Sequence, residues 1–145
     1  MFDPFRPRAA GATPQQFTLV LFPELAELVR LTAWVDEAGR KLGLSMQRLY
    51  ALQLCLEELV ATVIVRAQPK PNLPMSIVVA LIPKAEGLEV RVEHNGEPCD
   101  SALPQGGDDD SVVSLPELHL TRRFGTNIAF HRDAGLTRVT VLLAD

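Results

Sequence analysis

Two adjacent carboxylates, Glu57 and Glu58, stand in a stretch of the chain that is otherwise almost entirely apolar. The spacing of the apolar residues predicts a helix that Ser45 caps and that runs to about Ala67. A helix this apolar should be buried on more than one side, where an ionised carboxylate is costly unless another group pairs with it. Glu58 is therefore either a general base at a site or a carboxylate satisfied by an arginine or a water-filled groove.

Few other residues are candidates for catalysis or metal binding. Neither His119 nor His131 has a partner at metal-ligand spacing, which argues against a zinc site. No histidine lies on the first two predicted helices, so a histidine phosphotransfer role also lacks support. No serine or cysteine sits in the glycine-bounded elbow of a nucleophile. We expect Cys55 and Cys99 to be free thiols, with Cys55 acting as a small buried hydrophobe.

Composition limits the class of protein. The chain has 145 residues, of which 47% are hydrophobic and 22% charged, as in one compact domain. Its net charge of −4 and scattered basic residues argue against a nucleic-acid surface. The longest apolar run, Met75–Pro83, is too short to span a membrane, and the N-terminus lacks the pattern of a secretory signal. We therefore expect a cytoplasmic protein.

The pattern of elements predicts a fold. Residues 1–14 are expected to form a flexible leader, and residues 15–145 a single domain. The expected elements are a strand at Gln16–Phe22, a helix from Pro23 to Leu42 ended by Gly43, the helix from Ser45 to Ala67, strands at Met75–Ile82 and Leu88–His94, a loop at Glu97–Asp110, a helix from Ser114 to Phe124, and a hairpin of Asn127–His131 and Thr137–Leu143 across Arg132–Gly135. This order predicts an α+β two-layer sandwich, with a mainly antiparallel sheet covered on one face by three helices. We expect any site to lie between the layers.

Three short segments carry a resemblance to a known family: ELVAT at 58–62, HNGEPCD at 94–100 and LPEL at 115–118. In this order, and on these elements, they resemble the nucleotide motifs of the anti-sigma-factor serine/threonine kinases. These kinases belong to the GHKL superfamily, which has the Bergerat or histidine-kinase-like ATPase fold. The resemblance spans Gln16–Leu143 and implies that ATP and Mg²⁺ are the ligands of the ancestral site.

The first segment carries the catalytic and metal positions of that family. By resemblance, Glu58 is the base that acts on the attacking hydroxyl, and Thr62 takes the magnesium position one helical turn later. The family has asparagine at the second position. A threonine hydroxyl is shorter than a carboxamide, so the replacement weakens magnesium coordination.

The second and third segments carry the nucleotide positions. His94 replaces the aspartate that accepts a hydrogen bond from adenine, and Gly96 matches the glycine that lets the base approach. Around Glu117 the chain lacks the glycine-rich turn whose amides cradle the phosphates. Ser114 and Glu117 instead match a capping box, which would occupy the amides at the start of the third helix, and Glu117 adds a repelling negative charge.

These departures favour a regulator that acts by binding over an enzyme. The resemblance implies transcription regulation by partner switching, in which the protein binds a sigma factor or a STAS-type antagonist and forms a homodimer, with kinase activity weak or absent. One alternative is an active ATP- and Mg²⁺-dependent serine kinase with an unusual site. Another is an interaction or dimerisation module unrelated to transcription, since a fold does not specify a function.

Overall fold

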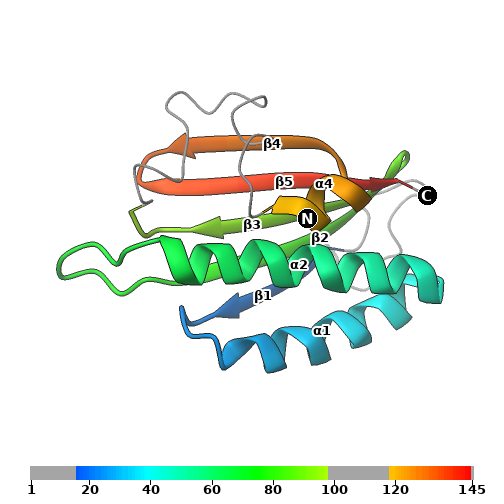
Figure 1. Ribbon diagram of the computed structural model, residues 1–145, viewed down its shortest axis with the longest axis horizontal. Coiled ribbons are helices and arrows are strands. Elements are labelled where there is room, and N and C mark those ends of the chain that lie inside the picture. Colours follow the sequence, from blue (N-terminus) through cyan, green and yellow to red (C-terminus); the bar gives the residue numbers. More distant parts are fainter. Residues whose placement is uncertain (1–15, 98–117, 145) are drawn as a thin grey trace, which may run out of the picture.

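The computed structural model describes residues 16–97 and 118–144 (Figure 1). The predicted leader, nearly all of the predicted loop, Cys99, Ser114 and Glu117 lie outside these residues. The described elements are β1 (Phe17–Leu21), α1 (Glu27–Leu42), α2 (Met46–Arg66), β2 (Ile77–Lys84), β3 (Gly87–His94), α4 (His119–Phe124), β4 (Thr126–Asp133) and β5 (Leu136–Ala144).

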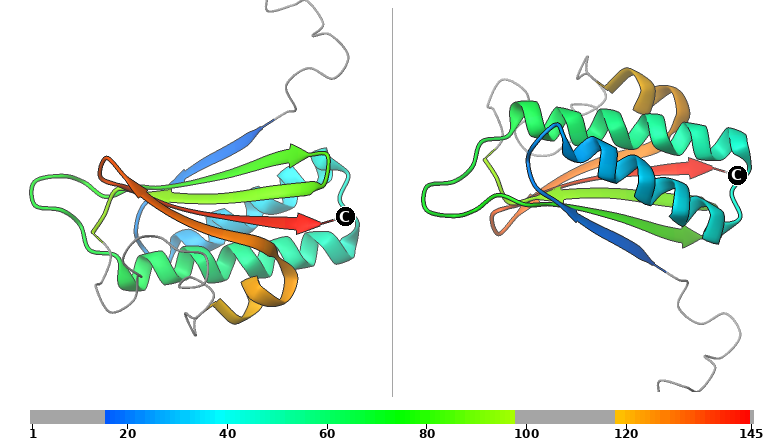
Figure 2. Two further views of the ribbon diagram at one scale, coloured as in Figure 1. Left: turned by 90° about the horizontal axis from the view of Figure 1, so that it is seen from above. Right: turned by 90° about the horizontal axis from the view of Figure 1, so that it is seen from below.

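The strands form one antiparallel sheet, and the helices lie on one of its faces (Figures 1 and 2). The strand order is β1-β2-β3-β5-β4, so β1 and β4 are the edges. Helix α2 is the middle helix and packs against α1 on one side and α4 on the other. The predicted α+β class, with a helical layer on an antiparallel sheet, is therefore confirmed for the described residues.

Alternation along β3 shows how the sequence builds the interface between the layers. Leu88, Val90 and Val92 are buried in the core, and His94 continues the same row as predicted. The intervening acidic and basic residues lie on the other face of the sheet. There Glu89 bridges Lys84 and Arg91 through ion pairs of 2.8 Å each.

Helix α1 begins later than the sequence indicated. Pro23 was expected as the first helical residue, but the helix starts at Glu27. The Glu27 carboxylate accepts a hydrogen bond of 2.9 Å from the backbone N–H of Phe22 and pairs with Arg30 at 3.1 Å. These contacts favour a separate turn at residues 23–26, so Glu24 precedes the helix instead of lying in its first turn.

The junction between α1 and α2 matches the sequence prediction. Gly43 ends α1 in the left-handed conformation with φ of 71°, which glycine adopts without a steric penalty. Two residues later, the Ser45 hydroxyl caps α2 by accepting from the N–H of Arg48 at 3.2 Å. The two helices are therefore neighbours in space as well as in sequence.

The β4–β5 hairpin is longer than predicted. Its turn was expected to take up Arg132–Gly135, but only Ala134 and Gly135 lie outside the strands. Both have positive φ, at 52° and 82°, as a tight two-residue hairpin turn requires. Arg132 consequently belongs to β4 and takes the alternating orientation of a strand residue.

Within the described residues, no helix is long and apolar enough to cross a membrane.

Candidate functional site

Helix α2 presents Glu58 to the start of α4. One carboxylate oxygen accepts from the backbone N–H of Leu120 at 2.9 Å. The other accepts from the N–H of Thr121 at 2.7 Å and from its hydroxyl at 2.6 Å. Glu58 is thus the partner of three donors that lie more than sixty positions further along the chain.

This arrangement concerns the start of the last helix. The described helix α4 begins at His119, and Leu118 before it makes no side-chain cap, whereas Ser114 and Glu117 of the predicted capping box lie outside the described residues. The first N–H groups of a helix have no partner inside it and carry partial positive charge, so a carboxylate stabilises them. Glu58 supplies that carboxylate from a neighbouring helix. The partner of Glu58 is therefore neither the arginine nor the open groove that the sequence suggested.

Cys55 lies one turn before Glu58 and faces the same helix. Its side chain is buried, and its Sγ lies 3.9 Å from the carbonyl oxygen of Leu120. Burial, together with the negative charge of Glu58, raises the pKa of the Cys55 thiol to about 12. Cys55 is the free thiol that was expected. We call the group formed by Cys55, Glu58, Leu120 and Thr121 the α2–α4 contact.

Thr62, the predicted magnesium position, is engaged by its own helix. Its hydroxyl donates to the backbone carbonyl of Glu58 at 2.7 Å, the usual back-bond of threonine within a helix. Among the described residues, no group of three His, Cys, Asp or Glu side chains is placed to hold a metal ion. In the part of the chain that the structure describes, the Thr62 hydroxyl is therefore used within α2.

His94, the predicted adenine contact, is a buried neutral imidazole. It is 4% exposed, and its Nδ1 accepts a hydrogen bond of 3.1 Å from the N–H of Gly96. Burial, together with the positive charges of Arg132 and Lys70, lowers the pKa of His94 to about 4. The ring nitrogen that would accept a hydrogen bond from a ligand is therefore already occupied.

Gly96 is required by the approach of its own chain. A Cβ at this position would lie 2.6 Å from the sulfur of Met75 and 2.8 Å from the backbone oxygen of Gln68. The neighbouring residue Glu97 exchanges two backbone hydrogen bonds with Gln68, each of 2.6 Å. The space beside Gly96, which in the resembled family admits a base, is filled here by Met75 and this bridge.

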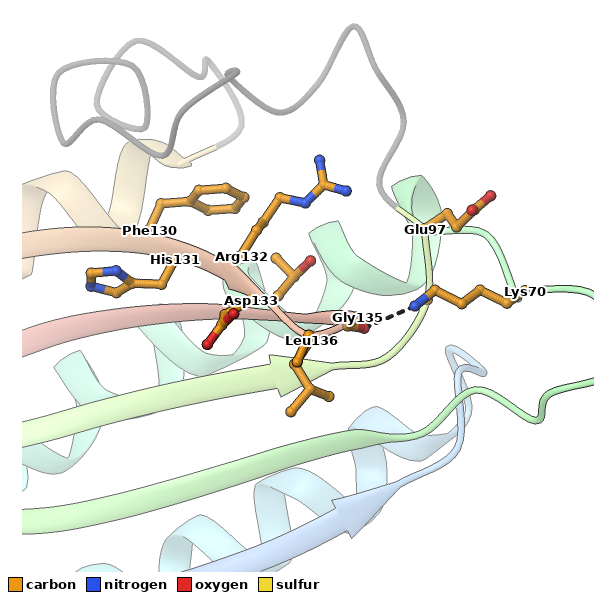
Figure 3. Close-up of a pocket in the computed structure, with 11 residues that line it drawn as sticks. Lys70, Glu97, Phe130, His131, Arg132, Asp133, Gly135 and Leu136 are labelled. Carbon is orange, nitrogen blue, oxygen red and sulfur yellow. Dashed lines mark hydrogen bonds between the residues drawn. The ribbon is translucent and has the colours of Figure 1, made fainter.

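A pocket of about 660 Å³ opens at the end of the β4–β5 hairpin (Figure 3). Its walls come from the hairpin, from the Gly96–Glu97 segment and from the loop after α2, which contributes Lys70. Of the predicted site residues that the structure describes, only Gly96 lines it. Sequence reasoning missed Lys70, Arg132 and Thr137, because they lie on a proline-rich loop and a hairpin where no spacing signals a site.

The predicted site residues therefore divide between two places. Glu58 and Thr62 belong to the α2–α4 contact or to α2 itself, whereas His94 and Gly96 lie beside the hairpin pocket. Their described hydrogen bonds are to other parts of the chain, and this geometry does not fit Mg²⁺-ATP as the family motifs would hold it.

No protein-family model matches the chain, and no curated protein matches its sequence.

Proposed function

We propose that this chain is a non-catalytic regulator of the anti-sigma type, built on a histidine-kinase-like ATPase scaffold. It binds a sigma factor or the STAS-type antagonist that active relatives phosphorylate, acts in the cytoplasm and forms a homodimer. The proposal starts from the family resemblance of the sequence. The order of strands and helices, and the antiparallel sheet under one helical layer, are compatible with that scaffold.

The engagement of Glu58 is the observation that carries the loss of catalysis. A general base must reach the proton it removes, at hydrogen-bonding distance in a plausible substrate pose. Both oxygens of this carboxylate instead accept from the first N–H groups of α4 and from the Thr121 hydroxyl. The same N–H groups are the donors that a bound phosphate would need. One contact thus engages both the predicted base and two of the N–H groups at the start of α4.

Exposed apolar side chains support a role in protein binding. Phe22 and Leu25, in the segment between edge strand β1 and α1, and Val29, in the first turn of α1, are 65%, 56% and 77% exposed. Val20 on β1 is 54% exposed as well. Single exposed apolar residues are common, but four within ten positions form a surface that a partner can cover.

Titration calorimetry with ATP and Mg²⁺ tests the loss of nucleotide binding. We expect no heat of ATP binding that requires Mg²⁺ or that changes in Glu58→Gln, and no transfer of labelled phosphate from ATP to purified STAS-domain proteins. Micromolar ATP binding, with phosphate transfer that Glu58→Gln abolishes, would instead identify an active serine kinase and overturn the proposal.

Binding to partners is tested separately, with purified sigma factors and STAS-domain proteins of the same organism. We expect one of them to co-elute with the chain in size-exclusion chromatography, and Phe22→Ser to weaken the complex. Tyr50→Ser is the matched control, because Tyr50 is 61% exposed on α2, away from the β1 surface. If none of these proteins binds, the chain is an interaction module outside transcription, and the proposal fails.

A further inference from the structure

The pocket at the β4–β5 hairpin contains cationic groups with unused hydrogen-bonding capacity. Within residues 16–97 and 118–144, no ion pair joins Arg132 to a carboxylate, so its guanidinium has all five N–H donors available. The Lys70 ammonium donates one hydrogen bond, of 3.0 Å, to the carbonyl of Gly135 (Figure 3). Two of its three donors are left for another acceptor.

The positive charges of Arg132 and Lys70 both act on His94, which is buried beside the pocket. Both Arg132 and Lys70 disfavour the charged form of buried His94, whereas neither Glu97 nor Asp133 offsets them there. Strand alternation explains why the Asp133 carboxylate does not act on His94. Figure 3 places Asp133 with His131 on the opposite side of β4 from Phe130 and Arg132. The side of the pocket that faces the helical layer is therefore positively charged.

Thr137 adds a neutral donor to this side. It is 3% exposed and lies on β5 directly opposite Arg132 of β4 in the strand register. Its hydroxyl has no hydrogen-bond partner in the described part of the chain, and the residue lines the pocket. A hydroxyl on the wall of a pocket can donate a hydrogen bond to water or to a ligand.

We propose that this pocket binds a small molecule that bears a phosphate group, held by Arg132, Lys70 and the Thr137 hydroxyl. A phosphate monoester carries close to two negative charges at neutral pH and so matches both cations, whereas a carboxylate neutralises only one. The planar guanidinium and the ammonium are the two side chains that proteins most often use for phosphate. The volume of about 660 Å³ leaves room for a body beyond the phosphate.

This site is separate from the start of α4, where the resembled kinases would hold phosphates. The proposal goes beyond the regulatory role and does not depend on it. A chain that binds no sigma factor can still bind phosphate at the hairpin, and the reverse is equally possible.

The test is an NMR titration of the full chain with inorganic phosphate, methyl phosphate and AMP, with acetate and adenosine as comparison ligands. We expect saturable shifts of the amide signals of Gly96, Gly135 and Thr137 with the three phosphate ligands. Arg132→Ala should weaken their binding at least about tenfold, the usual effect of losing a charged hydrogen-bond donor. Arg40→Ala, an exposed substitution on α1, should leave the affinity unchanged. Bound phosphate should also raise the pKa of His94, because it offsets the two cations.

Each other outcome contradicts the proposal. Equal loss of affinity in Arg40→Ala and Arg132→Ala would show attraction to overall charge instead of a site. Acetate binding as tightly as methyl phosphate would exclude phosphate selectivity, and adenosine binding as tightly as AMP would show recognition of the base. An absence of saturable shifts with any phosphate ligand would rule the site out.

Discussion

The α2–α4 contact and the hairpin pocket lie over the same sheet, yet they treat charge in opposite ways. At the α2–α4 contact, the Glu58 carboxylate meets three donors at 2.6–2.9 Å, so the chain satisfies its own charge. At the hairpin, Arg132 has no described ion pair and Lys70 uses a single donor. The first region therefore serves stability, whereas the second has hydrogen-bond donors that the described part of the chain does not use.

The largest effect that would test this contrast is the loss of Glu58. Glu58→Ala leaves the N–H groups of Leu120 and Thr121 without their acceptor, and we expect it to lower the free energy of unfolding by about 3 kcal/mol. Urea denaturation measures the change. Glu57→Ala is the matched control, one position away on the same helix, and should cost less than about 1 kcal/mol. Equal effects of the two substitutions would show that the α2–α4 contact contributes little to stability.

A smaller loss of stability is expected from a substitution at Gly96, beside the pocket, because the change affects packing and not charge. Gly96→Ala forces a methyl group against the Met75 sulfur and the Gln68 carbonyl, and we expect a cost of about 2 kcal/mol from overpacking. Thermal unfolding measures it. The additional substitution Met75→Ala should recover part of the loss in Gly96→Ala, because it removes one of the two obstacles. No recovery would place the strain at the Gln68–Glu97 bridge alone.

His94 predicts a pH dependence for the same region. Its pKa is lowered from 6.5 to about 4 in the folded chain, so the unfolded state binds a proton more readily between these values. Stability is therefore full above pH 6.5 and falls as the pH decreases towards 4. From pH 7 to 5.5 the loss should be about 1 kcal/mol, and His94→Gln should remove it. An unchanged pH profile in His94→Gln would mean that the imidazole titrates normally.

The smallest effect is expected at Arg132, and it makes the contrast with Glu58 sharpest. Because Arg132 is exposed and has no described ion pair, Arg132→Ala should change the free energy of unfolding by no more than about 0.5 kcal/mol. Urea denaturation of Arg132→Ala and of Glu58→Ala compares their free energies of unfolding directly. A loss as large as that of Glu58→Ala would show that the hairpin cation is structural.

Local patterns in the sequence were sufficient to predict most of the fold. Residue patterns predicted a helix where α1 lies and a strand where β3 lies, and the residue types at Gly43 and Ser45 predicted the end of α1 and the start of α2. These features depend on neighbours within about one helical turn or two strand positions. The start of α1 was misplaced because a carboxylate at Glu27, four residues after Pro23, organises the preceding turn.

The site was less predictable because its contacts join distant parts of the chain. Glu58 meets Thr121 across 63 positions, and Lys70 meets Gly135 across 65. Neither pairing has a periodic signature in the sequence. The resemblance drew attention to Glu58, His94 and Gly96, and the geometry gives each of them a hydrogen bond or packing contact within the chain.

The burial of Cys55 has a practical consequence for following the chain in solution. A thiol with a pKa near 12 and no exposed surface reacts very slowly with alkylating reagents while its surroundings remain closed. Because its sulfur lies against α4, modification requires that helix to separate from α2 or the whole domain to open. In a Cys99→Ser background, the rate of iodoacetamide labelling would therefore measure how fast the α2–α4 contact opens, without an added probe.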